Sequence, residues 1–310
     1  MNIKICGTGS ALPEKIITNK DLEKMVDTDD SWIVDRTGIS KRHKALADES
    51  VASLGAEAAR KALDMAGLSL DDIDLILVAT CSDDDRVPNC ACKIQKLLGK
   101  TNIPAFDINA ACTGFLTALT VADAYFNAGM YKRILIIGTE TLSRIIDYTD
   151  RGTCILFGDG AGAVVAEAIE SDKRMVSTLF ADGEKGDALA CRCDGKLMMD
   201  GQGVYKFATR SVPQAINATL EKAGLTPDDI DLFVLHQANK RIIDSIARTL
   251  KSDITKFPMN ISEVGNMSSA SIPVLLDDIN RKNIIKKGDT VVMSGFGAGL
   301  TYGACILTWE

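Results

Sequence analysis

The chain has 310 residues, of which 46% are hydrophobic, and its formal net charge is −7 at pH 7. This length permits one large domain or two ordinary ones with a substantial core, and the acidic balance argues against a nucleic-acid partner. The longest apolar runs, such as 134–137, are too short to cross a bilayer. The first residues form a strand-like stretch without a secretory leader, and nine cysteines suit a reducing compartment. We therefore expect a cytoplasmic protein without a membrane partner.

The first half alternates short apolar runs with longer helical patterns. Gly67 and Gly129 follow two of the helical patterns, at the position where glycine commonly ends a helix. We predict strands at 3–6, 75–80, 105–108, 134–138 and 163–166, and helices at 51–66, 91–98 and 113–128.

The second half repeats this order. We predict strands at 175–180, 232–235, 290–293 and 304–307, and helices at 205–223, at 241–250 and after Asn266. Strands this apolar, interleaved with helices, indicate sheets that are covered on both faces. We therefore predict an α/β fold in which two stacked halves, residues 1–169 and 170–310, form a five-layer α-β-α-β-α sandwich. The sequence between the halves has no linker composition, so we expect them to pack as one unit.

An internal repeat relates the two halves. AGLSLDDIDL at 66–75 returns as AGLTPDDIDL at 223–232, an offset of 157 (223 − 66). The later pair Ala163 and Ala304 is separated by only 141 (304 − 163), so the first half carries an insertion, which 141–157 contains. Insertions into a duplicated core commonly form binding segments. We expect the functional site where equivalent loops of the two halves converge.

Three chemically capable side chains lie at the ends of equivalent elements. Cys112 sits between a strand and a buried helix, whose free N–H groups favour a nucleophilic thiolate with a lowered pKa. His236 follows an apolar strand, and Asn266 is the counterpart of Asn109, which opens the Cys112 motif. Taken singly, these residues are ordinarily a buried thiol, a structural histidine and a helix cap. Together they suit acyl transfer through a thioester, and they would equally suit a hydrolase.

Several motifs together resemble those of one enzyme family. They are DTDDSWIVDRTGI at 27–39, AACTGF around Cys112, GDGAGA at Gly158, HQAN at His236, GNMSSASIP around Asn266 and a C-terminal GFGAGLTYGA. In this order and spacing they resemble β-ketoacyl-acyl carrier protein synthase III of bacterial fatty-acid synthesis. The resemblance implies a thiolase-like fold and a homodimer. It also implies a decarboxylative Claisen condensation of an acyl-CoA primer with malonyl-acyl carrier protein, without a metal or other cofactor, since acyl-CoA is a substrate.

The resemblance assigns roles around the nucleophile. Cys112 would carry the acyl group, while His236 and Asn266 would stabilise the enolate formed by decarboxylation. The backbone N–H groups of Cys112 and Ala298 would form the oxyanion hole. Val87 and Phe157 would line the acyl pocket, and Val87 stands where some relatives carry a phenylalanine that limits this pocket from across the dimer interface. We therefore expect a roomier pocket that accepts longer or branched primers.

The resemblance also assigns the surface that meets the substrates. The residues expected to bind coenzyme A are Thr28, Trp32, Arg36, Arg151 and Asn239. An indole and a guanidinium can enclose adenine, and arginine suits phosphate. The residues expected to dock the acidic carrier protein are Lys206, Gln237, Arg241 and Arg248. Arg241 and Arg248 are seven residues apart, so they share one face of a helix.

Other interpretations remain open from the sequence. The nearest is a specialised relative that uses the same three residues to prime or tailor a secondary metabolite. Elongating ketosynthases use two histidines, for which His43 is the available second residue, and degradative thiolases need a second cysteine, for which Cys305 is the candidate. A non-catalytic nucleotide-binding protein ranks lower, as does a zinc site at Cys90 and Cys92 or at Cys191 and Cys193. The acidic run 83–85 has no explanation at this level.

Overall fold

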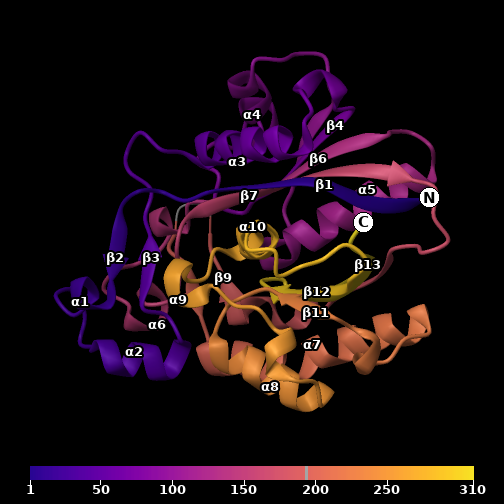
Figure 1. The fold of residues 1–310 in the computed structure, drawn as a ribbon. Coiled ribbons are helices and arrows are strands. Elements are labelled where there is room, and N and C mark those ends of the chain that lie inside the picture. Colours follow the sequence, from indigo (N-terminus) through magenta and orange to yellow (C-terminus); the bar gives the residue numbers. More distant parts are fainter. Residues whose placement is uncertain (193–194) are drawn as a thin grey trace.

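The computed structural model describes residues 1–192 and 195–310 and has five layers, helices–sheet–helices–sheet–helices (Figure 1). The first sheet has the order β1-β7-β6-β4-β5. Its strands are β1 (Asn2–Ala11), β4 (Leu75–Ala79), β5 (Ala105–Ile108), β6 (Arg133–Glu140) and β7 (Gly160–Ile169). β4 pairs in parallel with β5 and β6, and β7 pairs antiparallel with β6 and β1.

The second sheet repeats the first without its β5 edge. Its order is β11-β12-β13-β8, with β11 parallel to β12 and β13 antiparallel to both of its neighbours. The strands are β8 (Val176–Ala181), β11 (Leu232–Leu235), β12 (Thr290–Gly297) and β13 (Thr301–Thr308). Both sheets therefore have the same strand directions in the same order, which confirms the duplicated α/β sandwich predicted from the sequence. The predicted division between 169 and 170 falls at the end of β7.

Two helices form the central layer. α5 (Gly114–Asn127) and α10 (Ser271–Arg281) lie between the sheets, and their apolar side chains share one core with strands of both sheets. Phe115 and Leu275 are 1% and 0% exposed in this core. A helix that is apolar nearly all round, as predicted for α5, is stable only when it is covered on all sides, and the central position supplies that cover.

Helices on the outer faces complete the layers. They are α3 (Val51–Ala66) and α4 (Cys90–Leu98) on the first sheet, and α7 (Gly201–Ala223) and α8 (Lys240–Leu250) on the second. α3 ends at Gly67 and α7 at Gly224, both left-handed, so the repeat offset of 157 holds at the helix ends too. Among the described residues, no helix is both long enough and apolar enough to span a membrane.

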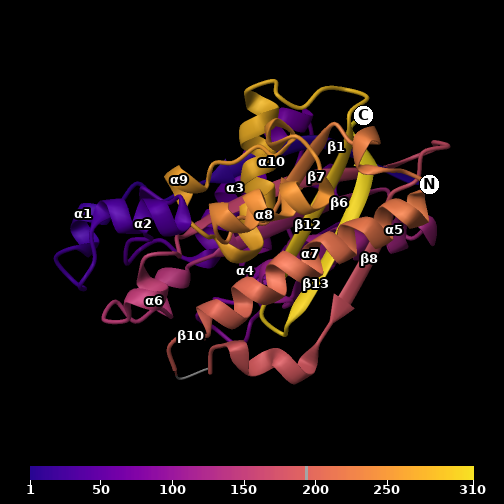
Figure 2. The ribbon, with the colours of Figure 1, turned by 90° about the horizontal axis from the view of Figure 1, so that it is seen from below.

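Two segments outside the repeat lie at one end of the molecule. The first is an N-terminal excursion with β2 (Ile16–Thr18), α1 (Asn19–Leu22), α2 (Asp30–Thr37) and β3 (Lys41–His43). The second is the inserted segment of the first half, which contains α6 (Arg151–Cys154). Figure 2 shows α1, α2 and α6 together at this end, beside α8 and α9 (Ile261–Val264) of the other half. The N-terminal excursion and the insertion therefore form one rim.

Candidate active site

The Cys112 turn and its counterpart in the second half have the same backbone geometry. Cys112 lies in the 3-10 helix η2 (Ala111–Thr113) ahead of α5, and η7 (Ser268–Ala270) precedes α10 in the same way. Ala111 and Ser268, the residues 157 apart that open these turns, have φ of +45° and +46°. The N–H of Ala111 donates to Asn109 Oδ1 at 3.4 Å, and the N–H of Ser268 donates to Asn266 Oδ1 at 2.9 Å. The duplicated motif therefore builds two equivalent turns, of which only the first carries a thiol.

Glycines on the strands let the two turns approach the sheets of the opposite halves. A Cβ on Gly138 of β6 would lie 2.3 Å from the Ser269 carbonyl oxygen, and a Cβ on Gly297 of β12 would lie 2.7 Å from Cys112 Cβ. Such distances are too short for any side chain, so the close approach requires glycine at these positions. Each half thus holds the active-site turn of the other half.

Cys112, His236 and Asn266 line one pocket of about 450 Å³. They are 7%, 3% and 4% exposed, respectively. His236 follows β11, and its ring lies edge-on to Phe296 of β12, with 5.4 Å between ring centroids. The structure therefore brings together the three residues that sequence analysis selected from three separate motifs.

His236 is buried, and neither of its ring nitrogens has a hydrogen-bond partner among the described residues. Burial lowers the pKa of His236 to about 3, so the imidazole is neutral near pH 7. A neutral imidazole carries one N–H donor and one acceptor, and a buried polar group without a partner is costly. Both nitrogens are therefore available to a ligand that enters the pocket.

The side-chain amide of Asn266 uses its oxygen for a hydrogen bond within the protein and leaves its nitrogen for the pocket. Its Oδ1 accepts from the Ser268 N–H, and its backbone pairs with the Phe157 region, where the Gly158 N–H donates to the Asn266 carbonyl at 2.9 Å. These contacts fix the side chain and orient the amide so that its nitrogen, a donor, can face a bound oxygen.

Burial dominates the acidity of the nucleophile. It raises the pKa of Cys112 to about 12, and hydrogen bonding from Ser268 acts in the opposite direction. The expected lowering of the pKa by the helix start is therefore outweighed in the closed pocket, and that expectation was wrong. The thiol is protonated at rest, and acyl transfer has to remove its proton.

Comparisons with known proteins agree with this geometry. Residues 106–183 match the family model described as 3-oxoacyl-[acyl-carrier-protein (ACP)] synthase III, and residues 220–309 match the model of its C-terminal part. The chain belongs to the 3-oxoacyl-[acyl-carrier-protein] synthase III family. It is 42% identical to the β-ketoacyl-[acyl-carrier-protein] synthase III of Clostridium acetobutylicum, with 99% of each chain covered.

Solved structures of synthase III proteins match over the whole chain. The enzyme of Aquifex aeolicus VF5 superposes with a TM-score of 0.97 at 42% identity, covering 99% of this chain and all of that one. The priming β-ketosynthase of the R1128 polyketide pathway superposes with a TM-score of 0.93 at 35% identity, covering 100% and 96% of the two chains. The thiolase-like fold and the enzyme class predicted from the sequence are thereby confirmed.

Most of the predicted coenzyme A residues lie at the rim of the pocket of this synthase III chain. Trp32, Arg36 and Asn239 line the pocket itself. Arg151 lies over the Trp32 ring, with its guanidinium carbon 4.8 Å from the ring centroid, and Arg36 lies 5.8 Å from the same centroid. The indole therefore already has a cation near its face. Thr28 does not line the pocket, and its buried hydroxyl has no hydrogen-bond partner within 1–192 and 195–310.

A second cavity of about 210 Å³ adjoins the nucleophile. Cys112, Phe157 and Ala298 line it, as does Leu142 of the inserted segment. This is where the predicted oxyanion-hole residues and the predicted acyl-pocket residue Phe157 meet. Val87 does not line this cavity in the single chain and is 83% exposed, so any contribution to an acyl pocket has to come from a partner subunit.

The predicted docking residues separate into exposed and buried ones. Arg241 and Arg248 are exposed and line the same hollow of about 490 Å³ beside Tyr205, and exposed Lys206 lines a neighbouring hollow. Gln237 is only 1% exposed, and its amide oxygen and nitrogen are occupied by Asn260. The side chain of Gln237 is therefore too deeply buried to contact a partner protein, and the docking role predicted for it is wrong.

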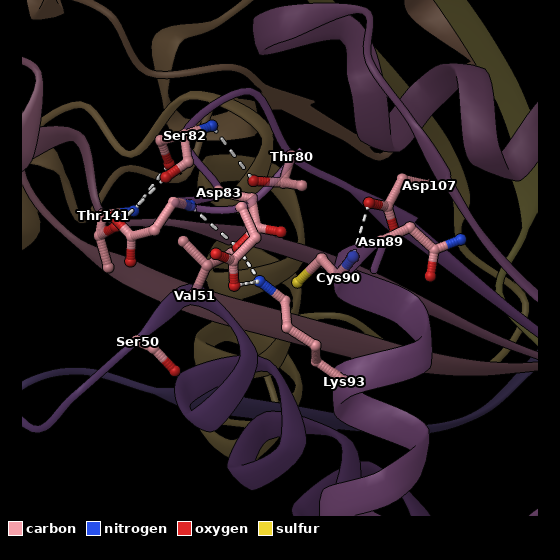
Figure 3. Close-up of polar contacts among 12 residues, drawn as sticks. Ser50, Val51, Thr80, Ser82, Asp83, Asn89, Cys90, Lys93, Asp107 and Thr141 are labelled. Atoms are coloured by element: carbon pink, nitrogen blue, oxygen red, sulfur yellow. Dashed lines mark hydrogen bonds and ion pairs between the residues drawn. The ribbon is translucent and has the colours of Figure 1, made fainter. Parts of the chain in front are cut away.

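The acidic run 83–85 holds the loop that ends in Val87. Lys93 of α4 pairs with Asp83 at 2.6 Å and with Asp85 at 3.1 Å, and Arg144 pairs with Asp84. Figure 3 shows Lys93 reaching Asp83 from α4. The run is thus a set of ion pairs that anchors the loop after β4 to the outer helix layer and to the insertion.

Residues on which the rival interpretations relied lie away from the pocket. His43 is in β3, with its Nδ1 2.6 Å from the Pro13 carbonyl oxygen, and does not line the Cys112 pocket. Cys305 is 1% exposed in β13, where burial raises its pKa to about 12. Within 1–192 and 195–310 no three His, Cys, Asp or Glu side chains are placed to hold a metal, and Cys193 lies outside the described residues.

Proposed function

We propose that this chain initiates fatty-acid synthesis by condensing an acyl-CoA primer with malonyl-acyl carrier protein. The observation that carries the proposal is a buried thiol, Cys112, in one pocket with Asn266 and with His236, whose ring nitrogens have no hydrogen-bond partner in the part of the chain that the structure describes. This set suits the stabilisation of an enolate, because two neutral side chains can donate hydrogen bonds to the negatively charged oxygen without adding a charge of their own.

In the first step Cys112 takes the acyl group. Its sulfur attacks the thioester carbonyl carbon of the primer, and the coenzyme leaves as a free thiol with the proton from Cys112. The N–H groups of Cys112 and Ala298 receive the negative charge on the carbonyl oxygen, as the cavity that both residues line supports. The acyl chain then occupies that cavity, and the coenzyme crosses the rim at Trp32, Arg36 and Arg151.

In the second step malonyl-acyl carrier protein loses CO2. The electrons of the broken bond form an enolate, and His236 and Asn266 donate hydrogen bonds to its oxygen. The enolate carbon attacks the acyl carbon on Cys112, and the tetrahedral intermediate collapses to the β-ketoacyl product and the Cys112 thiolate, which takes up a proton. Neutral His236 suits this role because its lowered pKa keeps it a hydrogen-bond donor that carries no charge of its own.

A two-stage labelling experiment tests the mechanism. Radiolabelled acyl-CoA is added first, and malonyl-acyl carrier protein is added after gel filtration. We expect label on Cys112 that is chased into β-ketoacyl product. Cys112→Ala should lose the first stage, whereas His236→Ala and Asn266→Ala should keep it and lose the second. Label that never forms on a folded chain would contradict the proposal, and normal condensation by Asn266→Ala would refute the role of that residue.

A priming ketosynthase of secondary metabolism is the second candidate. The match to the R1128 priming enzyme at 35% identity supports it, although the Aquifex aeolicus synthase III is more similar in sequence, at 42% identity. The two candidates differ in carrier protein, so condensation rates with fatty-acid and polyketide carrier proteins separate them. A preference for the polyketide carrier would replace the first candidate by the second.

The range of acyl-CoA primers that the chain accepts is also a proposal, and it is based on Val87. A small residue at this exposed loop tip supports acceptance of isobutyryl- and butyryl-CoA besides acetyl-CoA. Turnover of the three primers tests this, and strict selectivity for acetyl-CoA would contradict it. The homodimer and the cytoplasmic location expected from the sequence also remain predictions.

A further inference from the structure

Glu140 is a buried carboxyl group for which the mechanism above has no role. It is the last residue of β6 and is 0% exposed. Among the described residues no lysine, arginine or histidine forms an ion pair with it, although the other buried carboxyl group between the halves, Asp277, has Arg281 at 2.9 Å. A buried carboxylate without a cation is costly, so its surroundings have to explain its presence.

Hydrogen-bonding groups from both halves surround the Glu140 carboxyl group. Oε2 lies 2.5 Å from the Ser82 hydroxyl and 3.1 Å from the Cys81 amide nitrogen. Oε1 lies 2.7 Å from the Ser269 hydroxyl of the second half, 3.4 Å from the Ser269 amide nitrogen and 3.4 Å from Cys81 Sγ. Thr80 adds a longer contact to Oε2 at 3.3 Å. One side chain thus joins the loop after β4, which lines the acyl cavity, to the η7 turn beside Asn266.

The repeat shows what this carboxyl group replaces. Ser269 is the counterpart of Cys112 (269 − 112 = 157), and Glu140 is the counterpart of Gly297 (297 − 140 = 157). In the second half the missing side chain of Gly297 leaves room for the thiol. In the first half the Glu140 side chain occupies the corresponding space and contacts the Ser269 hydroxyl, which stands in the place of the thiol. The second potential nucleophile position is therefore closed by a carboxyl group.

The proton count at Ser269 identifies the state of Glu140. The Ser269 hydroxyl lies 2.8 Å from the Ala79 carbonyl oxygen as well as 2.7 Å from Oε1, yet it has only one proton to donate. The carbonyl oxygen can only accept, so both short contacts are hydrogen bonds when Glu140 supplies the second proton. On the other side Ser82 accepts from the Thr141 N–H at 2.9 Å, as Figure 3 shows, and is free to donate to Oε2.

Burial acts in the same direction as this proton count. It raises the pKa of Glu140, although hydrogen bonds from Ser82, Ser269 and Cys81 oppose it. Among the described residues, the thiols of Cys81, Cys90 and Cys112 lie close enough for the charge of an ionised Glu140 to raise their pKa, and none of them carries a positive charge. The surroundings of Glu140 therefore favour the neutral carboxylic acid over the carboxylate.

The turn that Glu140 holds contacts the nucleophile. Ser268 precedes Ser269. Its hydroxyl lies 3.7 Å from Cys81 Sγ, and hydrogen bonding from this side chain lowers the pKa of Cys112. Its N–H also orients Asn266. A shift of the η7 turn would therefore move a donor to the nucleophile and the amide proposed for the enolate at the same time.

We infer that Glu140 is a positioning residue that works as a neutral carboxylic acid, donating to Ser269 and accepting from Ser82 and Cys81, and so fixes the turn carrying Ser268 and Asn266 against the Cys112 turn. The predicted effect of Glu140 on condensation rests on the proposed function. Its predicted effect on the reactivity of the Cys112 thiol is independent of that function. Glutamine has the same shape as a protonated glutamate, with one donor side and one acceptor side. Glu140→Gln therefore preserves the arrangement, and Glu140→Leu removes it.

The test compares Glu140→Gln and Glu140→Leu by the pH dependence of Cys112 alkylation with iodoacetamide and by single-turnover condensation. We expect Glu140→Gln to stay within about twofold of the parent chain in both, because the amide keeps the short hydrogen bonds to Ser82 and to the Ser269 hydroxyl and loses only the 3.4 Å contacts to Oε1. We expect Glu140→Leu to shift the alkylation profile and to slow decarboxylation by about tenfold or more, with the KM for acyl-CoA unchanged, because misplacement at the reacting centre is costly.

Asp277→Asn is the matched control, since Asp277 also joins the two halves but pairs with Arg281 and does not touch the Cys112 or η7 turns. It should lower stability and leave Cys112 alkylation unchanged. An infrared band of a protonated carboxyl group near pH 7, absent from Glu140→Gln, supplies a readout independent of activity. Loss of activity in Glu140→Gln as large as in Glu140→Leu, or absence of the infrared band, would overturn the neutral acid. A normal alkylation profile in Glu140→Leu would overturn the positioning role.

Discussion

Replacing Gly297 by alanine introduces one methyl group at the nucleophile. The new Cβ would lie 2.7 Å from Cys112 Cβ, 2.8 Å from its amide nitrogen and 3.1 Å from its sulfur. To reach an ordinary contact of about 3.4 Å, β12 or the Cys112 turn has to retreat by about 0.7 Å. Overpacking of this kind costs about 1–3 kcal/mol of stability. The methyl group would also cover the Cys112 N–H proposed for the oxyanion hole.

The substitution should also slow the reaction. A displacement close to 1 Å in a reacting group reduces the rate by about 100-fold, which is about 2.7 kcal/mol in the barrier. We expect Gly297→Ala to show this loss in the single-turnover rate of Cys112 acylation, measured by mass spectrometry. Thermal unfolding of the same sample should show a folded chain.

Gly295, two residues earlier on β12, is the matched control. Its added Cβ would meet Cys112 O, His236 Cβ and Leu116 Cδ1, each at 3.4 Å, which are ordinary contacts. Gly295→Ala should therefore acylate within about threefold of the parent chain, since no atom has to move. The reasoning is refuted if Gly297→Ala acylates normally, or if both substitutions reduce the rate equally.

Three further predictions concern the rim, the histidine and the docking surface. Trp32→Ala should raise the KM for acyl-CoA about tenfold at unchanged kcat, because the indole binds the coenzyme outside the reacting centre; a fall in kcat alone would contradict this. His236 has a pKa of about 3 in the folded chain and about 6.5 in the unfolded chain. Between these two pH values only the unfolded chain binds a proton at His236. Acidification through this range therefore lowers the free energy of unfolding by up to about 1.4 kcal/mol per pH unit. Equilibrium unfolding of His236→Phe should lack that part of the slope, and an unchanged slope would refute the burial argument. Arg241→Glu with Arg248→Glu should raise the KM for carrier protein about tenfold at low salt and less at high salt, whereas exposed Lys96→Glu on the opposite outer layer should not.

The architecture was predictable because the repeat carries it. Equal offsets at 66–75 and 223–232 required equivalent strands, and the structure has them in the same order in both sheets. The catalytic candidates were predictable for the same reason, since Cys112 and Asn266 occupy equivalent turns. The boundaries of α3 and β11 match the predictions, whereas β6 and β12 run longer because their ends continue into the active-site contacts.

The burial and the pKa of individual site residues, by contrast, could not be predicted from the residue types alone. The pKa of Cys112 depends on how completely the second half covers it, and the position of Gln237 depends on the Asn260 backbone, which is distant in sequence. Glu140 escaped notice because β6 reads as an ordinary buried strand. The repeat offset applied to Cys112 and Gly297 would have pointed to Ser269 and Glu140, but the meaning of that pair requires the distances between the halves.

The crossed contacts of the two halves have a consequence for synthesis. The Cys112 turn rests on Gly295 and Gly297 of β12, and β12 is synthesised after α5 and the rest of the first half. Until then α5 has only one of its two sheets to cover it, and the thiol has neither His236 nor the β12 backbone beside it. The nascent first half therefore presents an apolar surface with an unshielded cysteine, and chaperone contact during translation should concentrate on this interval and end when β12 and β13 pair.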